Sequence, residues 1–225
     1  MIKLYELFAG RPPIAVAERP DTTLVRRRAT NVQEPAGRAG LGDEDVAPWT
    51  AVRASWLRAA DHDTAAAAVA ALRSGLRPAG ARQSLLARET VHIDRARVHE
   101  GIKALFLLTR QPDMRHRDCI DYWQSVHAPL VARTFGDALV RYSTNDCLPA
   151  TMRSWWPEEA PPYDGIAELW FDLDQGQWRD ELSRVAPLLA EDERRFIGSY
   201  RVVVAREMLH VGRLSDPLPV DEVPA

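Results

Sequence analysis

His127 is the residue best suited to proton transfer, because an unperturbed histidine titrates at about pH 6.5 and can both accept and return a proton. Its neighbours at helical steps of three and four are Trp123, Leu130 and Val131, so its helix face is mostly apolar. Pro129 has no backbone N–H, and we expect it to disrupt the helix and open a concavity beside His127. Two interpretations stay open on these residues: a histidine hydrogen-bonded in the core, or an acid–base residue in a pocket.

Glu168 is a second candidate acid or base. In a predicted strand it shares a face with Ile166 and Trp170, and a carboxyl group between apolar neighbours is expected to have a raised pKa. The alternative is a salt bridge, with Arg141 or Arg201 as the expected partner.

A polar strand face follows the predicted helix. Arg141, Ser143 and Asn145 alternate with Val140, Tyr142 and Thr144, so the first three side chains share one face. Arginine and asparagine there could bind a carbonyl, an enolate or a carboxylate. The alternative is a polar seam between two halves of the molecule, since residues 27, 29 and 31 repeat the pattern as Arg27, Ala29 and Asn31.

Two further groups could contact a substrate. Trp155 and Trp156 lie in a proline-rich loop, where they could stack on an aromatic ligand or simply cover one end of the fold. Asp164 precedes Gly165 at a turn-like entry to a strand, where a turn-forming side-chain hydrogen bond is expected, and it is kept as a substrate-binding candidate.

The motifs of metal and nucleotide sites are missing from the sequence. His116 and Cys119 share a helical face, but no Cys-x-x-Cys pair and no His-Glu-x-x-His motif accompanies them. Gly37, Gly40 and Gly42 are not followed by a predicted helix, as a phosphate-binding loop would be. We therefore expect neither a metal nor a cofactor.

Composition narrows the class of protein. The 225 residues carry a net charge of −3, which argues against a nucleic-acid or anionic-membrane partner. Two cysteines cannot form a disulfide framework, so reduced thiols and a cytoplasmic location are expected. The N-terminus does not resemble a signal peptide, and no stretch is apolar enough to span a membrane.

The chain repeats itself, which predicts its architecture. Similar blocks recur in the same order at offsets of 100, 114 and 118 residues, beginning with Ile2-Lys3 and Ile102-Lys103, which hold the only two lysines. The repeated blocks resemble strands. Helices are predicted over about 115–133, over Gln175–Leu189 and over Asp63–Leu76. Pro187 is expected to bend the second of these helices or to end it early. Residues 10–22 contain three prolines and predict no helix.

The predicted fold class is therefore α+β. Residues 98–214 have the β-α-β-β-α-β order of a ferredoxin-like unit, and residues 1–97 form a degenerate unit without its first helix. Residues 215–225 are a tail. Each unit leaves one sheet face uncovered, so the tandem repeats are expected to pack sheet against sheet as an intramolecular, pseudo-dimeric α+β barrel.

Three segments together resemble the EthD-type family of the dimeric α+β barrel superfamily. They are Asp121–Val131 with its tryptophan, histidine and proline, then Leu139–Tyr142, then Tyr163–Phe171, within a resemblance that covers about 102–211. The first repeat is only weakly similar. The resemblance implies small cofactor-independent enzymes that act on polyketide-like and aromatic intermediates by cyclisation with dehydration, decarboxylation or lactone isomerisation.

The leading hypothesis is a cofactor-independent lyase or cyclase with His127 and Glu168 as catalytic residues. The candidate substrate-binding residues are Trp123, Arg141, Tyr142, Asn145, Asp164, Trp170, Trp155 and Trp156. The alternatives are a non-catalytic carrier of a hydrophobic aromatic metabolite, and oxygen chemistry or haem binding as in other members of the superfamily, including a cofactor-free monooxygenase. The expected partner is a small molecule, and a homo-oligomer is left open.

Overall fold

The computed structural model describes residues 1–8, 25–33, 48–57, 64, 67, 81–95, 102–148, 163–171 and 177–211. The strands are β1 (Ile2–Phe8), β2 (Val25–Gln33), β3 (Ala51–Leu57), β4 (Ala81–Asp94), β5 (Ile102–Arg110), β6 (Leu139–Cys147), β7 (Gly165–Phe171) and β8 (Ile197–Val211). The helical segments are α2 (His116–Tyr122), the π-helical turn η2 (Trp123–His127), α3 (Ala128–Phe135), the 3-10 turn η3 (Gly136–Ala138) and α4 (Gln177–Glu193).

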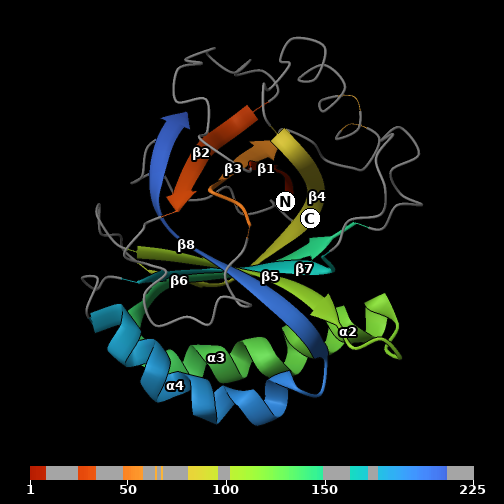
Figure 1. Ribbon diagram of the computed structural model, residues 1–225, viewed down its shortest axis with the longest axis vertical. Helices are drawn as coiled ribbons and strands as arrows, with labels where there is room; N and C mark the ends of the chain where they lie inside the picture. Colours follow the sequence, from red (N-terminus) through yellow and green to blue (C-terminus); the bar gives the residue numbers. More distant parts are fainter. Residues whose placement is uncertain are drawn as a thin grey trace, which may run out of the picture.

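The strands form a closed antiparallel barrel in the order β1-β3-β2-β8-β5-β7-β6-β4 (Figure 1). Within it the first four strands follow the order β4-β1-β3-β2 and the last four the order β8-β5-β7-β6. The pairs β2·β8 and β4·β6 join the two halves in matching register, since Asn31 faces Glu207 and Glu89 faces Asn145. This is a mixed α/β protein built on an eight-stranded antiparallel barrel.

Side chains along the strands that the helices cover point alternately into the barrel and toward the helices. On β5, Leu105 and Leu107 belong to the interior apolar cluster, whereas Ala104 and Leu108 belong to the cluster that contacts the helices. In Figure 1 the helices lie below β5–β8, with α3 and α4 side by side. The described helices therefore cover the outer face of the second half of the barrel.

The helix predicted over about 115–133 is confirmed, but it is not broken at Pro129. The π turn precedes the proline, and the Ala128 N–H donates to the Trp123 carbonyl five residues earlier. A wider turn accommodates the missing donor and the bulk of the proline ring while the chain stays helical. Gly136, at φ 55°, ends this helical segment.

Pro187 was expected to bend its helix or to end it early. The early end is wrong, because α4 continues to Glu193. Burial of Trp178, Val185 and Leu189 against the sheet holds the helix on both sides of the proline. Residues 10–22 and 215–225 lie outside the described residues, as does Asp63–Leu76 apart from Thr64 and Ala67, which are helical. In the part of the chain that is described, no helix is long and apolar enough to cross a membrane.

Candidate active site

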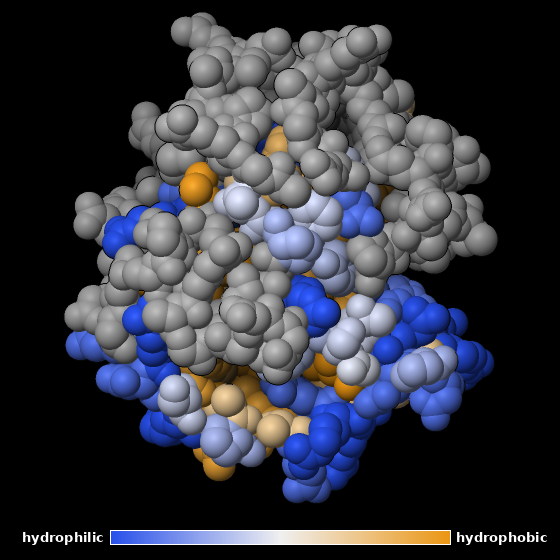
Figure 2. Space-filling model, in the orientation of Figure 1, coloured by the Kyte–Doolittle hydropathy of each residue, from blue (hydrophilic) through white to orange (hydrophobic). Residues whose placement is uncertain are grey.

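A cavity of about 240 Å³ lies between the sheet and the helices of the second half. Its walls are Phe106, Leu108, Trp123, His127, Val131, Phe135, Tyr142, Ala167, Leu169, Leu182, Ser183, Ala186, Leu189, Glu193, Ile197, Tyr200 and Val202. Most of these side chains are apolar. Figure 2 shows apolar (orange) side chains between hydrophilic (blue) ones in the lower part of the molecule, where the helices lie in Figure 1. Mostly apolar walls with a few polar groups are typical of small-molecule sites.

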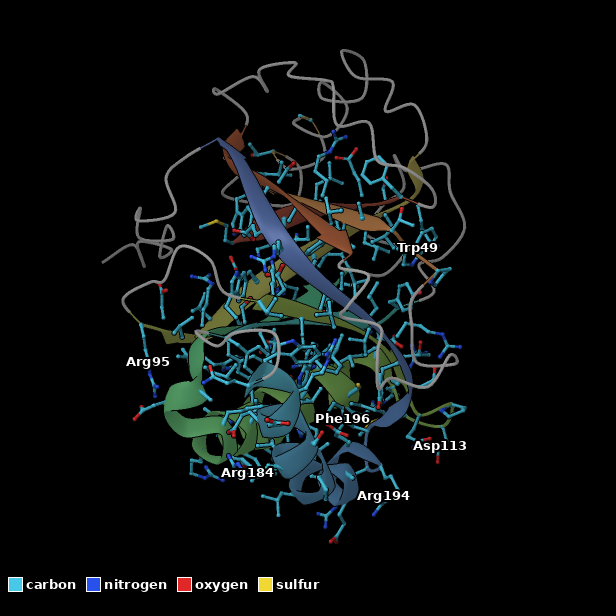
Figure 3. All side chains as sticks on the ribbon, turned by 60° about the vertical axis from the view of Figure 1, so that its left-hand side comes forward. Trp49, Arg95, Asp113, Arg184, Arg194 and Phe196 are labelled. Carbon is cyan, nitrogen blue, oxygen red and sulfur yellow. The ribbon has the colours of Figure 1, made fainter. Side chains whose placement is uncertain are left out.

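His127 is held in the cavity wall by a carboxylate. Its Nδ1 lies 2.7 Å from Oδ2 of Asp192, and the Tyr122 hydroxyl donates to Oδ1 of the same carboxylate at 2.5 Å. The His127 ring also packs on Phe196, with centroids 5.0 Å apart; Figure 3 labels Phe196 at the turn between α4 and β8. When Nδ1 donates its proton to Asp192, Nε2 is the basic atom of the neutral ring.

Burial lowers the pKa of His127, although the Asp192 carboxylate acts in the opposite direction. The apolar surroundings disfavour the charged imidazolium more than the carboxylate stabilises it. At neutral pH the ring is therefore neutral, oriented and able to accept a proton.

Glu193 lines the same cavity and was not identified from the sequence. Burial, followed by the neighbouring Asp192 charge, raises its pKa to about 7, and Arg194 opposes the shift. Successive residues on a helix point about 100° apart, so Asp192 reaches His127 while Glu193 faces the cavity. Two adjacent carboxyl groups thus have different surroundings, one fixing a base and the other retaining a proton near neutral pH.

Trp123 and Tyr142 complete the wall around His127, where both are almost completely buried. Gly165 makes the position of Trp123 possible, because a Cβ at Gly165 would overlap the indole ring. Burial raises the pKa of Tyr142, and nearby Glu193 adds to the shift, so the phenol keeps its proton and can donate a hydrogen bond. The structure therefore brings three predicted site residues together: Trp123, His127 and Tyr142.

Glu168 lies elsewhere, in the barrel interior, and the expected direction of its pKa shift is wrong. Its carboxylate lies 2.5 Å from Lys3 Nζ and 2.8 Å from Lys103 Nζ, and these two cations lower its pKa despite complete burial. The expected partners were Arg141 or Arg201. The two lysines are instead the partners, which makes Glu168 an ion-pair residue that stays ionised at neutral pH.

The remaining predicted residues of the strands also point into the barrel. Arg141 pairs with Glu89 and Asp94, each at 3.1 Å, and Asn145 donates to the Ile166 carbonyl at 2.9 Å. The Trp170 ring lies 4.1 Å from Lys103 Nζ. The shared face of Arg141, Ser143 and Asn145 is confirmed, but it faces away from His127.

Asp164 takes part in an ion cluster at the start of β7. It pairs with the Arg110 guanidinium, accepts from the Arg110 backbone N–H at 2.9 Å, and lies 3.0 Å from Nδ1 of His116. The other ring nitrogen of His116 lies 2.8 Å from Asp146, and the hydrogen bonds to the two aspartates raise the pKa of His116 to about 9. Asp164 thus joins α2 to the strands rather than lining the cavity.

Two expectations complete the inventory of predicted sites. Trp155 and Trp156 lie outside the described residues. Among the residues that the structure describes, no group of three or more His, Cys, Asp or Glu side chains is placed to hold a metal ion.

A comparison with protein families finds a match within the second half of the chain. Residues 111–199 match the family model of the EthD domain. This match confirms the resemblance seen in the sequence, and the EthD family belongs to the dimeric α+β barrel superfamily. No curated protein matches the sequence. The matched residues include the whole helical segment that carries Trp123 and His127.

Two solved structures, both named "putative monooxygenase", match the chain over most of its length. The protein from Fusobacterium nucleatum has a TM-score of 0.54 at 8% identity, with 92% of each chain covered. The protein from Lactobacillus acidophilus has a TM-score of 0.45 at 6% identity, with 92% of this chain and 94% of that chain covered. At 8% identity, the likeness to the Fusobacterium nucleatum protein concerns the fold alone.

Proposed function

We propose that this chain, which carries an EthD domain over residues 111–199, is a cofactor-independent lyase or cyclase acting on an aromatic or polyketide-like ketone. The observation that carries the proposal is a neutral histidine, oriented by the partly buried Asp192 carboxylate, in the wall of an apolar cavity. An apolar cavity of about 150 Å³ is enough to bind benzene, so a cavity of about 240 Å³ has room for a ligand of one or two rings.

The proposed first step is removal of a proton from the carbon next to a substrate carbonyl. Nε2 of His127 accepts the proton, and Asp192 stabilises the imidazolium that forms. The Tyr142 hydroxyl, which keeps its proton, donates a hydrogen bond to the enolate oxygen. The apolar walls exclude water and hold the ring system against the base.

Deuterium exchange at C2 of 1-tetralone in D2O tests this step without knowledge of the natural substrate. The exchange needs a base and no leaving group, so it isolates the role of His127. We expect His127→Ala and His127→Asn each to slow the catalysed exchange at least about 10²-fold, which corresponds to about 2.7 kcal/mol of transition-state stabilisation. His127→Asn keeps a hydrogen-bonding group but accepts no proton near neutral pH, and exchange by this variant at the wild-type rate would refute the proposal.

A monooxygenase, here one without a cofactor, is the second candidate, because the structural relative from Fusobacterium nucleatum is named "putative monooxygenase". The same cavity and the same base would serve it, since removing a phenol proton produces an electron-rich anion that reacts with oxygen. Oxygen uptake with 1-naphthol, compared with turnover under anaerobic conditions, separates the two functions. A carrier protein would bind 1-naphthol but catalyse neither reaction.

We also infer that the two halves are tandem ferredoxin-like units, bounded at residues 1–97 and 98–214. Both halves have the strand order in which the fourth strand lies beside the first and the third beside the second. The interior side chains support the same inference, because Lys3 and Glu89 in one half occupy the places of Lys103 and Glu207 in the other.

A further inference from the structure

Glu193 is the one carboxyl group among the described residues that line the cavity. It follows Asp192 directly at the end of α4, so the backbone that places the anchor of His127 also places Glu193. Tyr142, on the opposite wall, lies near enough for the Glu193 charge to raise the pKa of its phenol. Glu193 therefore faces the same space as the proposed base and the proposed enolate donor.

The position of Glu193 on α4 is unusual for a structural glutamate. Leu182, Ala186 and Leu189 line the cavity at steps of four and three, and Glu193 follows at a further step of four. It thus occupies the apolar stripe of the helix. A charge in such a place is costly, and a partly buried carboxyl group next to the Asp192 charge avoids the cost by holding its proton.

We propose that Glu193 is a second catalytic residue of this cavity, a proton donor to a leaving hydroxyl, and that the reaction is loss of water from an uncharged β-hydroxy ketone. The proposal rests on the function proposed above for His127. Loss of water needs both a base and an acid, whereas exchange or isomerisation through an enolate needs the base alone.

The step balances without any oxidant or further reactant. His127 Nε2 takes the proton from the α carbon, the C–H electron pair forms the new carbon–carbon double bond, and the C–O bond at the β carbon breaks. The hydroxyl leaves with the Glu193 proton as water. The imidazolium then returns its proton to the Glu193 carboxylate through that water, which restores both residues.

The walls also indicate an uncharged substrate. Neither lysine nor arginine is among the described residues that line the cavity, so a substrate carboxylate would be buried there without a counter-charge. The titratable and charged groups around Glu193 are His127 and Tyr142 in the cavity wall and the adjacent Asp192 and Arg194. A neutral ketone that becomes aromatic on losing water fits both the volume and the charge.

The test uses 3-hydroxy-1-tetralone, which loses water to give fluorescent 1-naphthol, beside C2 deuterium exchange of 1-tetralone. We expect Glu193→Gln to slow dehydration at least about 10²-fold and to change the exchange less than about threefold, because amide nitrogen is no acid. Glu191→Gln, on the same helix with a side chain 80% exposed, is the matched control and should leave both rates unchanged. Binding of 1-naphthol, followed by quenching of tryptophan fluorescence, checks that the cavity of each variant is intact.

Each other result has a definite meaning. Dehydration by Glu193→Gln at the wild-type rate, or an equal loss of dehydration and exchange in that variant, overturns the role of Glu193. Wild-type protein that catalyses exchange but not dehydration also overturns it, while the role of His127 stands. Wild-type protein that binds 1-naphthol but catalyses neither reaction overturns the proposed function itself. If Glu193→Gln fails to fold, Glu193→Asp replaces it, and a fall in dehydration alone is again the expected result.

Discussion

Replacing Glu168 with glutamine should cost stability without costing catalysis. Glu168 is completely buried and its carboxylate pairs with both Lys3 and Lys103. Removing one partner of a buried ion pair costs about 3–5 kcal/mol. Here each lysine keeps a second carboxylate, Glu89 at 2.6 Å for Lys3 and Glu207 at 2.9 Å for Lys103. We therefore expect the lower end of that range.

The expected loss is about 3 kcal/mol, which for a chain of this size lowers the Tm by about 6–12 °C. Urea unfolding at neutral pH measures the free energy, and 1-tetralone exchange on folded protein at 20 °C measures catalysis. The pH dependence has a definite sign, because the pKa of Glu168 is lowered in the folded state. The stabilisation that ionised Glu168 contributes is present above pH 4.5, the ordinary pKa of glutamate, and is lost as the pH falls below that value. The difference in unfolding free energy between wild type and Glu168→Gln should therefore shrink in acid.

One result would refute this reasoning. If Glu168→Gln keeps the wild-type free energy of unfolding but slows exchange about 10²-fold or more, Glu168 acts in catalysis and the cavity beside His127 is not the active site. Glu191→Gln serves again as the control, since its exposed side chain should contribute little to stability.

Three further predictions concern residues around the cavity and in the barrel interior. The ion pairs of His116 stabilise the folded wild type fully below pH 6.5, the ordinary pKa of histidine, and this stabilisation is lost as the pH rises through about 9. His116→Gln should remove this stabilisation, and urea unfolding across that pH range measures the difference. Gly165→Ala should displace the Trp123 ring and weaken 1-naphthol binding at least about tenfold, as followed by fluorescence quenching. Lys3→Met and Lys103→Met should each lower the free energy of unfolding by about 3 kcal/mol, because the two lysines occupy equivalent places, and unequal losses in urea unfolding would contradict that equivalence.

Local pattern in the sequence was enough to predict the helix that carries His127. The apolar spacing of Trp123 and His127 follows the helical period, and Pro129 marked the place where the hydrogen bonding changes. What Pro129 does there, favouring a π turn instead of a break, depends on packing against the sheet and α4. The repeated blocks likewise indicated strands, but not the order in which they close into a barrel.

The partners of the candidate site residues could not be read from the sequence. Asp192 is separated from His127 by 65 residues and Lys3 from Glu168 by 165, so only the closed fold brings them together. A signal for Glu193 did exist, four residues beyond Leu189 on the apolar stripe, but the helix was expected to bend or end near Pro187. The prediction of a raised pKa for Glu168 was wrong because its carboxylate lies beside two lysines, which lower the pKa.

The pH–rate profile of 1-tetralone exchange, measured for wild type and His127→Asn, tests the central claim most directly. Because burial lowers the pKa of His127, the wild-type rate should rise with pH at a midpoint below 6.5, so that most of the rise is complete at neutral pH. The rate of His127→Asn should not rise with pH in this range, and it should be at least about 10²-fold below the wild-type rate. A variant with the wild-type profile and rate would contradict the account, since another group would then be the base.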